Sequence, residues 1–107
     1  MDGKGEDMYG LHGRLMAQAG QGAALLKIML DGLTDMPGCH LYIISQDHTD
    51  PDSLWIYEVW ASQADHQASL QLESVQAMIA QARPLIAGMA DRLEFTPVGG
   101  KGLPPAS

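Results

Sequence analysis

Two residues that can carry acid–base chemistry lie close together in the middle of the chain, Glu58 and His66. A carboxylate within an apolar strand is costly to bury unless it is paired, and a neutral imidazole accepts a proton near neutral pH. Trp60 lies between them, at the end of the apolar run. A large ring at this position can close a ligand pocket. We therefore expect a pocket here, with His66, Trp60 and Glu58 as candidate catalytic residues.

Each of these residues also has a purely structural interpretation. Glu58 can form a structural salt bridge with Arg14 or His12 if the strand that carries them lies next to the strand of Glu58. We expect such a salt bridge at least as much as a role of Glu58 as a catalytic acid. His66 can be a solvated residue in the first turns of a helix. Trp60 can be a packing aromatic. The sequence leaves these alternatives open.

Four further residues are candidates for substrate contact. Tyr42 and Tyr57 can line or stack on an aromatic ring, and Met78 suits an adaptable apolar pocket or an ordinary core equally well. His12 is either a core imidazole bonded to Glu58 or a second base. The spacings of the histidines and Glu58 match no familiar metal-ligand pattern, so we expect no metal site.

The elements that must position these residues follow from periodicity. Alternating and β-branched runs predict strands over residues 8–16, 39–46, 54–60 and 92–98. Helical spacing predicts helices over 23–33 and 62–70, and a further helical stripe from Val75 to Met89. Pro84 lies inside that stripe, so we expect a kink or a fresh helical start near Arg83-Pro84. Ser62 followed three residues later by Asp65 has the spacing of a capping box, so the helix that carries His66 should begin there.

The order β-α-β-β-α-β predicts an α+β, ferredoxin-like fold with an antiparallel sheet. The first and third strands should run through the middle of that sheet, with the helices on one face. The third strand is apolar on both sides, since Trp55, Tyr57 and Val59 alternate with other apolar residues. The helices can hide only one face. We therefore expect a homodimer through the other face.

Length and charge limit the possible functions. The 107 residues carry a formal net charge of −7, and the cations are scattered, which disfavours nucleic acid and anionic membranes as partners. No apolar run approaches the roughly 20 residues that span a bilayer, and the first residues lack the apolar segment of a secretory signal. A single cysteine, Cys39, suggests a cytoplasmic location. We expect a disordered lead (1–7), one domain (8–100) and a flexible tail (101–107).

Three features carry a family resemblance: Pro37-Gly38-Cys39 before the second strand, the run LWIYEVW over 54–60, and His66 six residues after Trp60. With these features in this order of elements, the chain resembles the antibiotic biosynthesis monooxygenase family over residues 8–100. The family comprises small dimeric α+β-barrel proteins and includes quinol monooxygenases. The resemblance implies a pocket between sheet and helices, and oxygenation of a small phenol or quinol by O₂ without metal, flavin or haem. His66 would be the base, with His12 as the second choice.

The chain also departs from some relatives. It contains no asparagine, and residues 70–80 contain no histidine. Haem-degrading relatives use an Asn-Trp-His set with the histidine well into the second helix, so haem degradation is not expected. The alternative is that the chain is a ligand-binding or stress-linked protein of the same fold, with a pocket but no catalytic turnover of a substrate. The distinguishing feature is whether His66 and Glu58 reach one shared cavity.

Overall fold

The computed structural model describes residues 7–104 and contains four strands and three α-helices. The expected lead, apart from Asp7, and the last three residues of the expected tail lie outside the described residues. In chain order the elements are β1 (Tyr9–Ala17), α1 (Gly22–Asp31), β2 (Cys39–Gln46), β3 (Ser53–Trp60), α2 (Gln63–Ser69), α3 (Glu73–Ala82), a short 3₁₀ turn η1 (Arg83–Leu85) and β4 (Ile86–Phe95).

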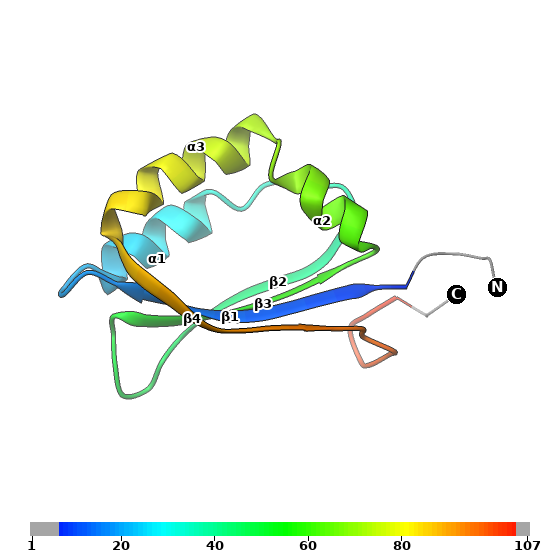
Figure 1. Cartoon of the computed structure of the whole chain (residues 1–107), viewed down its shortest axis with the longest axis horizontal. Coiled ribbons are helices and arrows are strands. Elements are labelled where there is room, and N and C mark those ends of the chain that lie inside the picture. The colour runs from blue at the N-terminus through cyan, green and yellow to red at the C-terminus, as the bar shows by residue number, and fades with distance from the viewer. Residues whose placement is uncertain (1–6, 105–107) are drawn as a thin grey trace.

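The strands form one antiparallel sheet in the order β2-β3-β1-β4. The helices α1, α2 and α3 all lie on the same side of this sheet (Figure 1). The first and third strands are central, and the predicted ferredoxin-like α+β fold is confirmed. In the described part of the chain, no helix has both the length and the apolar character needed to cross a bilayer.

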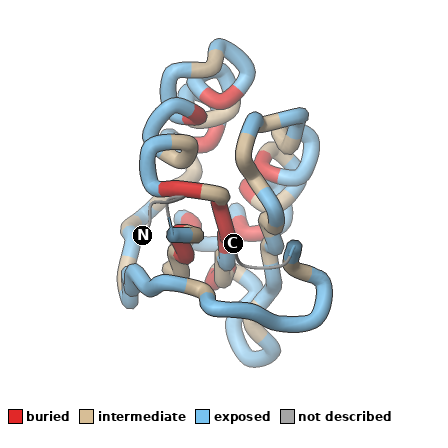
Figure 2. Tube along the Cα trace, turned by 90° about the vertical axis from the view of Figure 1, so that its right-hand side faces the viewer, coloured by how far each residue is buried: buried red, intermediate tan, exposed pale blue. Residues whose placement is uncertain are grey.

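The core lies between the sheet and the helices α1 and α3. Figure 2 shows the buried residues of the helices and the sheet in red. The buried members of the core are Leu15, Ala17, Leu25, Met29, Leu54 and Ala82. Leu25 and Leu54 are completely buried. Burial of such a side chain contributes about 1.5–3 kcal/mol to folding. This packing holds α1 against the sheet and leaves α2 as a separate short helix near the ends of β1 and β3.

The start of α2 confirms the predicted cap. The Ser62 side chain accepts a hydrogen bond from the backbone N–H of Asp65 at 3.1 Å. Gly38 lies beside this helix with φ of 82°, and a Cβ atom there would clash with the Asp65 carboxylate. The Gly38 carbonyl also accepts a hydrogen bond from the backbone N–H of Ala61. These contacts fix where α2 begins and therefore where His66 lies.

The predicted helical stripe from Val75 to Met89 is wrong in its second part. The helix α3 ends at Ala82, and the chain is already extended at Ile86, six residues before the expected start of the fourth strand. Pro84 has no N–H to donate and its ring crowds the preceding turn. A fresh start does occur at Arg83, but it is only the short 3₁₀ turn η1, and the chain then enters β4. The expected strand over 92–98 ends at Phe95, so Pro97 lies beyond it.

A bulge in β4 changes which side chains face the helices. Between the pairs Arg14–Ala90 and His12–Leu93, one β1 residue opposes two β4 residues, Asp91 and Arg92. Asp91 has the left-handed φ of 55°, which a bulge accommodates. Before the bulge Met89 pairs with Leu15, and after it Glu94 pairs with Leu11. The helix-facing positions of β4 thus change from odd to even numbers.

The opposite face of the sheet has no helix over it in the described chain (Figure 1). Ile43, Tyr57, Leu93 and Phe95 are all exposed by at least a third of their surface. Alternation along the strands places them on this side. We call this surface, comprising Ile43, Tyr57, Leu93 and Phe95, the helix-free face.

Candidate active site

A cavity of about 850 Å³ lies between the sheet and the three helices. Most of its wall is apolar and comes from β1, α1, α3 and β4, with Leu11, Leu15, Met29, Val75, Met78 and Ile79 among its residues. Its polar side chains include Glu58 from β3 and His66 from α2. A mostly apolar cavity with a few converging polar groups is the usual form of a small-molecule site.

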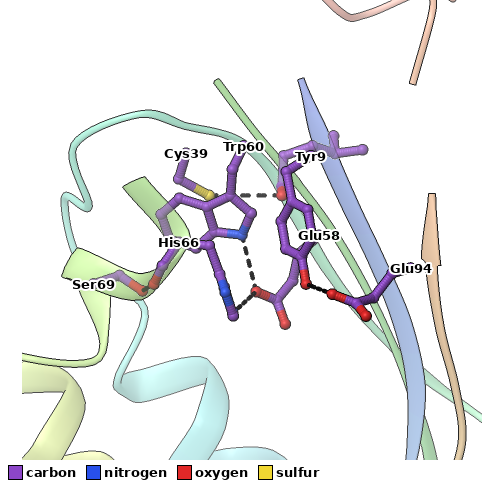
Figure 3. Close-up of polar contacts among 8 residues, drawn as sticks. Tyr9, Cys39, Glu58, Trp60, His66, Ser69 and Glu94 are labelled. Atoms are coloured by element: carbon purple, nitrogen blue, oxygen red, sulfur yellow. Dashed lines mark hydrogen bonds and ion pairs between the residues drawn. The ribbon is translucent and has the colours of Figure 1, made fainter. Parts of the chain in front are cut away.

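Glu58 is the buried carboxylate at one end of this cavity, with 8% of its surface exposed. Its Oε1 accepts a hydrogen bond from Trp60 Nε1 at 3.0 Å and lies 3.7 Å from His66 Nε2 (Figure 3). Burial raises the pKa of Glu58, and the Trp60 N–H and the charge of Arg92 offset this only in part. Residues two apart on a strand share a face, so β3 brings Glu58 and Trp60 together directly.

The imidazole of His66 is held between two aromatic rings. The Tyr9 ring centroid lies 5.3 Å from it, and the Trp60 ring meets it edge-on at 5.5 Å. Burial, and then the charge of Arg92, lower the pKa of His66. The imidazole is therefore neutral at pH 7 and able to accept a proton. The Ser69 hydroxyl donates to the backbone carbonyl of His66 at 2.6 Å, which adds support within α2.

Tyr9 connects the site to the edge strand β4. Its hydroxyl donates a hydrogen bond to Glu94 Oε2 at 2.5 Å (Figure 3). Burial and the nearby Glu94 carboxylate raise the pKa of Tyr9. The same hydrogen bond lowers the pKa of Glu94. Tyr9 thus remains a neutral phenol that fixes one side of the His66 ring.

This arrangement suits proton transfer. A neutral imidazole and a carboxylate face the same apolar space, and a proton taken by the imidazole would lie beside the Glu58 oxygen. In residues 7–104, no three side chains among His, Cys, Asp and Glu converge on a point where a metal ion would be held.

The sequence profile described as antibiotic biosynthesis monooxygenase matches residues 8–81. The chain belongs to the antibiotic biosynthesis monooxygenase family. The resemblance seen in the sequence is therefore confirmed.

Solved structures share this fold, and one of them is also similar in sequence. A candidate antibiotic biosynthesis monooxygenase from Chloroflexus aurantiacus J-10-fl is 50% identical, with 91% of this chain and 99% of that one covered and a TM-score of 0.87. A second candidate from Caulobacter crescentus CB15 has 22% identity over 88% and 92% of the two chains and a TM-score of 0.79. A mutant of SnoaB from Streptomyces nogalater, a cofactor-independent oxygenase, has 14% identity over 89% and 97%, with a TM-score of 0.73. No curated protein matches the chain.

The predicted site residues fall into two groups. Glu58, Trp60, His66, Tyr42 and Met78 all line the cavity of this family member. Burial strongly raises the pKa of Tyr42, so this phenol is neutral. Tyr57 does not line the cavity, because alternation places it on the helix-free face.

His12 contributes to the cavity wall, but its ring packs on the other side of the sheet. Its ring stacks on Trp55 at 5.4 Å and lies 5.9 Å from the ring of Tyr57. The imidazole of His12 is therefore turned away from Glu58, although the residue contributes to the cavity wall.

Two structural alternatives are wrong. Glu58 pairs with neither Arg14 nor His12, because the register places both opposite Trp55 and Tyr57 on the other side of the sheet. Arg14 instead lies over the Trp55 ring at 5.2 Å and forms a salt bridge with Asp91 at 3.1 Å. His66 is not a solvated helix residue, since its side chain is only 13% exposed.

Three residues of the site were missed from the sequence: Tyr9, Arg92 and Glu94. Tyr9 shares a face with Leu11 and Leu15, and this alternation was visible. The bulge that turns Arg92 and Glu94 towards the helices has no signature in the order of residues around Asp91.

Proposed function

We propose that this protein is a cofactor-independent monooxygenase that oxidises a phenol or quinol with O₂. The observation that carries the proposal is that His66 and Glu58 meet in one cavity, with Nε2 and Oε1 3.7 Å apart. Membership of the antibiotic biosynthesis monooxygenase family supports the reaction class. SnoaB, which shares the fold, is described as a cofactor-independent oxygenase.

In this proposal His66 is the base. Its neutral imidazole takes the proton of the substrate hydroxyl, and the nearby Glu58 oxygen stabilises the imidazolium that forms. The electron-rich anion then passes an electron to O₂, and a carbon–oxygen bond forms on the ring. For a quinol, the balanced outcome is C₆H₆O₂ + O₂ → C₆H₄O₃ + H₂O. The quinol supplies both electrons that reduce the second oxygen atom to water, so no other reductant is required.

The cavity wall provides the remaining requirements. Trp60 and Tyr42 present ring surfaces, and Met78 presents a flexible apolar side chain. The apolar part of the wall limits contact with water and strengthens the interaction of polar groups with the developing charge. A volume of about 850 Å³ is within the range of pockets that hold drug-sized ligands. More than one ring therefore fits.

We also propose that the protein acts as a homodimer through the helix-free face. In the single chain, Ile43 is 45% exposed and Leu93 is 58% exposed. Exposed apolar patches of this kind are usual at protein interfaces. The free Cys39 fits a reducing compartment, so we propose a cytoplasmic location.

Oxygen uptake with a panel of quinols tests the proposed reaction. We expect wild-type protein to consume O₂ with at least one quinol, and His66→Ala to reduce the rate by roughly 10²–10⁴-fold. His48→Ala is the matched control, since His48 is exposed in the loop between β2 and β3. It should keep the wild-type rate. Saturable binding of quinols without O₂ consumption would identify a non-catalytic binding protein instead.

A further inference from the structure

The bulge in β4 has a direct consequence for the chemistry of the cavity. Continued alternation from Met89, which pairs with Leu15 on the helix side, would point Arg92 to the helix-free face. The extra residue at Asp91 reverses this, and Arg92 lines the cavity. Asp91 adopts φ of 55°, and its carboxylate is held by Arg14 at 3.1 Å. A left-handed non-glycine residue costs energy that surrounding contacts must offset. The salt bridge to Arg14 is such a contact, and the bulge that it supports places Arg92 at the cavity wall.

Each carboxylate near Arg92 has a second partner besides Arg92 or a different partner altogether. Glu94 Oε2 accepts from Tyr9, and only its Oε1 faces Arg92 Nη1, at 3.4 Å. Asp91 is paired with Arg14. An incoming anion can therefore replace Glu94 on Arg92 while Glu94 keeps its bond to Tyr9. Arg92 is 56% exposed, so it is accessible from solvent.

The charge of Arg92 reaches the reacting groups. After burial, it is the next cause that lowers the pKa of His66, and it offsets part of the burial that raises the pKa of Glu58. The molecule as a whole has a formal charge of −7, which repels anionic ligands unless a local cation attracts them. Arg92 provides such a cation on the wall of the same cavity that contains His66.

We propose that Arg92 is a specificity-determining residue that binds a carboxylate group on an aromatic substrate. The substrate hydroxyl then points to His66 and Glu58, while the carboxylate pairs with the guanidinium near the solvent. A planar guanidinium binds a carboxylate through two parallel hydrogen bonds, which fixes orientation as well as affinity. This inference rests on the proposed function and adds the chemical class of its substrate.

Two other arginines line the cavity, Arg14 and Arg83. Arg14 is held by Asp91 at 3.1 Å and lies over the Trp55 ring, so Arg83 is the competing cation. It lies in η1 and also lines the cavity, but it is placed by the turn that follows α3 rather than by the bulge. Arg92 and Arg83 are therefore tested side by side.

The experiment is calorimetric titration of naphthalene-2-carboxylate and its neutral isostere naphthalene-2-carboxamide. Neither probe has a hydroxyl, so binding is measured without turnover. We expect wild-type protein to bind the carboxylate more tightly, and Arg92→Gln to weaken carboxylate binding by about 10–100-fold, the range of a charge-assisted pair. Binding of the carboxamide should be little changed. Arg92→Lys should retain part of the preference, added salt should reduce it, and Arg83→Gln should leave it intact.

Three outcomes would overturn the assignment. Wild-type protein that binds the carboxylate no better than the carboxamide, or that binds neither, has no such site. Equal losses for both probes in Arg92→Gln would show a packing role, with the urea midpoint of the variant checking its fold. Loss of the preference in Arg83→Gln would move the site to η1. A retained carboxylate preference without O₂ uptake by any quinol would refute the proposed oxygenation alone.

Discussion

At the scale of single residues, His66 is suited to the proposed reaction because its imidazole is uncharged when it meets the substrate. Burial and the charge of Arg92 both lower its pKa, so the neutral form extends to lower pH than the ordinary value of about 6.5 allows. The wild-type rate should therefore rise with pH through an apparent pKa below 6.5. Removal of the charge in Arg92→Gln should move that midpoint upwards. Rates with a quinol across pH 4–9 measure both, and a rise only above pH 8 would point to ionisation of the substrate itself.

Glu58 should lower stability at neutral pH. Its pKa is raised in the folded chain by burial, so the folded state binds the proton more tightly than the unfolded state does. Stability therefore falls as pH rises above about 4, the ordinary range of a glutamate. Glu58→Gln removes this loss and should be more stable than wild type at pH 7.

Urea midpoints at pH 4 and pH 7 check this prediction for Glu58. The difference between Glu58→Gln and wild type should shrink towards pH 4. The variant should also turn over more slowly, because the imidazolium of His66 loses its carboxylate partner. A variant that is less stable at pH 7 would show that Glu58 is a net stabilising ion-pair member.

Alternation along a strand predicts which side chains share a face of the sheet, but not which side chains from different elements meet. Glu58 and Trp60 are two residues apart on one strand, which places them on one face, and both line the cavity. The same rule places Tyr57 on the face opposite to Trp60. The strand register places His12 on the face opposite to Glu58. The contact between His66 and Glu58 joins a helix to a strand, and such a tertiary distance is not encoded in the spacing of the two residues.

At the scale of elements, the position of His66 depends on the cap of α2. Ser62→Ala removes the side-chain acceptor for Asp65 N–H and should cost about 1 kcal/mol. We expect a lower quinol turnover as well, with a smaller loss than in His66→Ala. Ser74→Ala, in the first turn of α3, removes no cap and only an exposed hydrogen bond to Thr34, so it should change stability by less than about 0.5 kcal/mol. Equal urea midpoints for the two variants would contradict this role of Ser62.

The capped start of α2 was predictable from local spacing, whereas the end of α3 was not. Helical spacing of apolar residues continues past Ala82 to Met89, although those later residues belong to β4. Pro84 favours a break, and the competition between a kink and a new strand is decided by pairing with β1. The bulge at Asp91 similarly depends on Arg14, a residue far away in sequence.

At the scale of the whole molecule, the helix-free face should hold two copies together. Light scattering at micromolar concentration should give about twice the 11.5 kDa mass of one chain. Tyr57→Lys places a charge in the middle of this face and should shift the protein towards monomer, because an unpaired charge is costly to bury. Leu30→Lys is the control, as Leu30 is similarly exposed at 49% but lies on α1. A stable wild-type monomer would refute the dimer.

The central claim is that the cavity around His66 and Glu58 transfers oxygen from O₂ to an aromatic substrate. Incubation of the wild-type protein and of His66→Ala with a quinol under ¹⁸O₂, followed by mass spectrometry of the product, tests this claim directly. The account predicts that one ¹⁸O atom enters each product molecule formed by wild type, the other leaving as water. It also predicts that His66→Ala forms this product at roughly 10²–10⁴-fold lower rate. Product without ¹⁸O, or equal labelled product from both proteins, would contradict it.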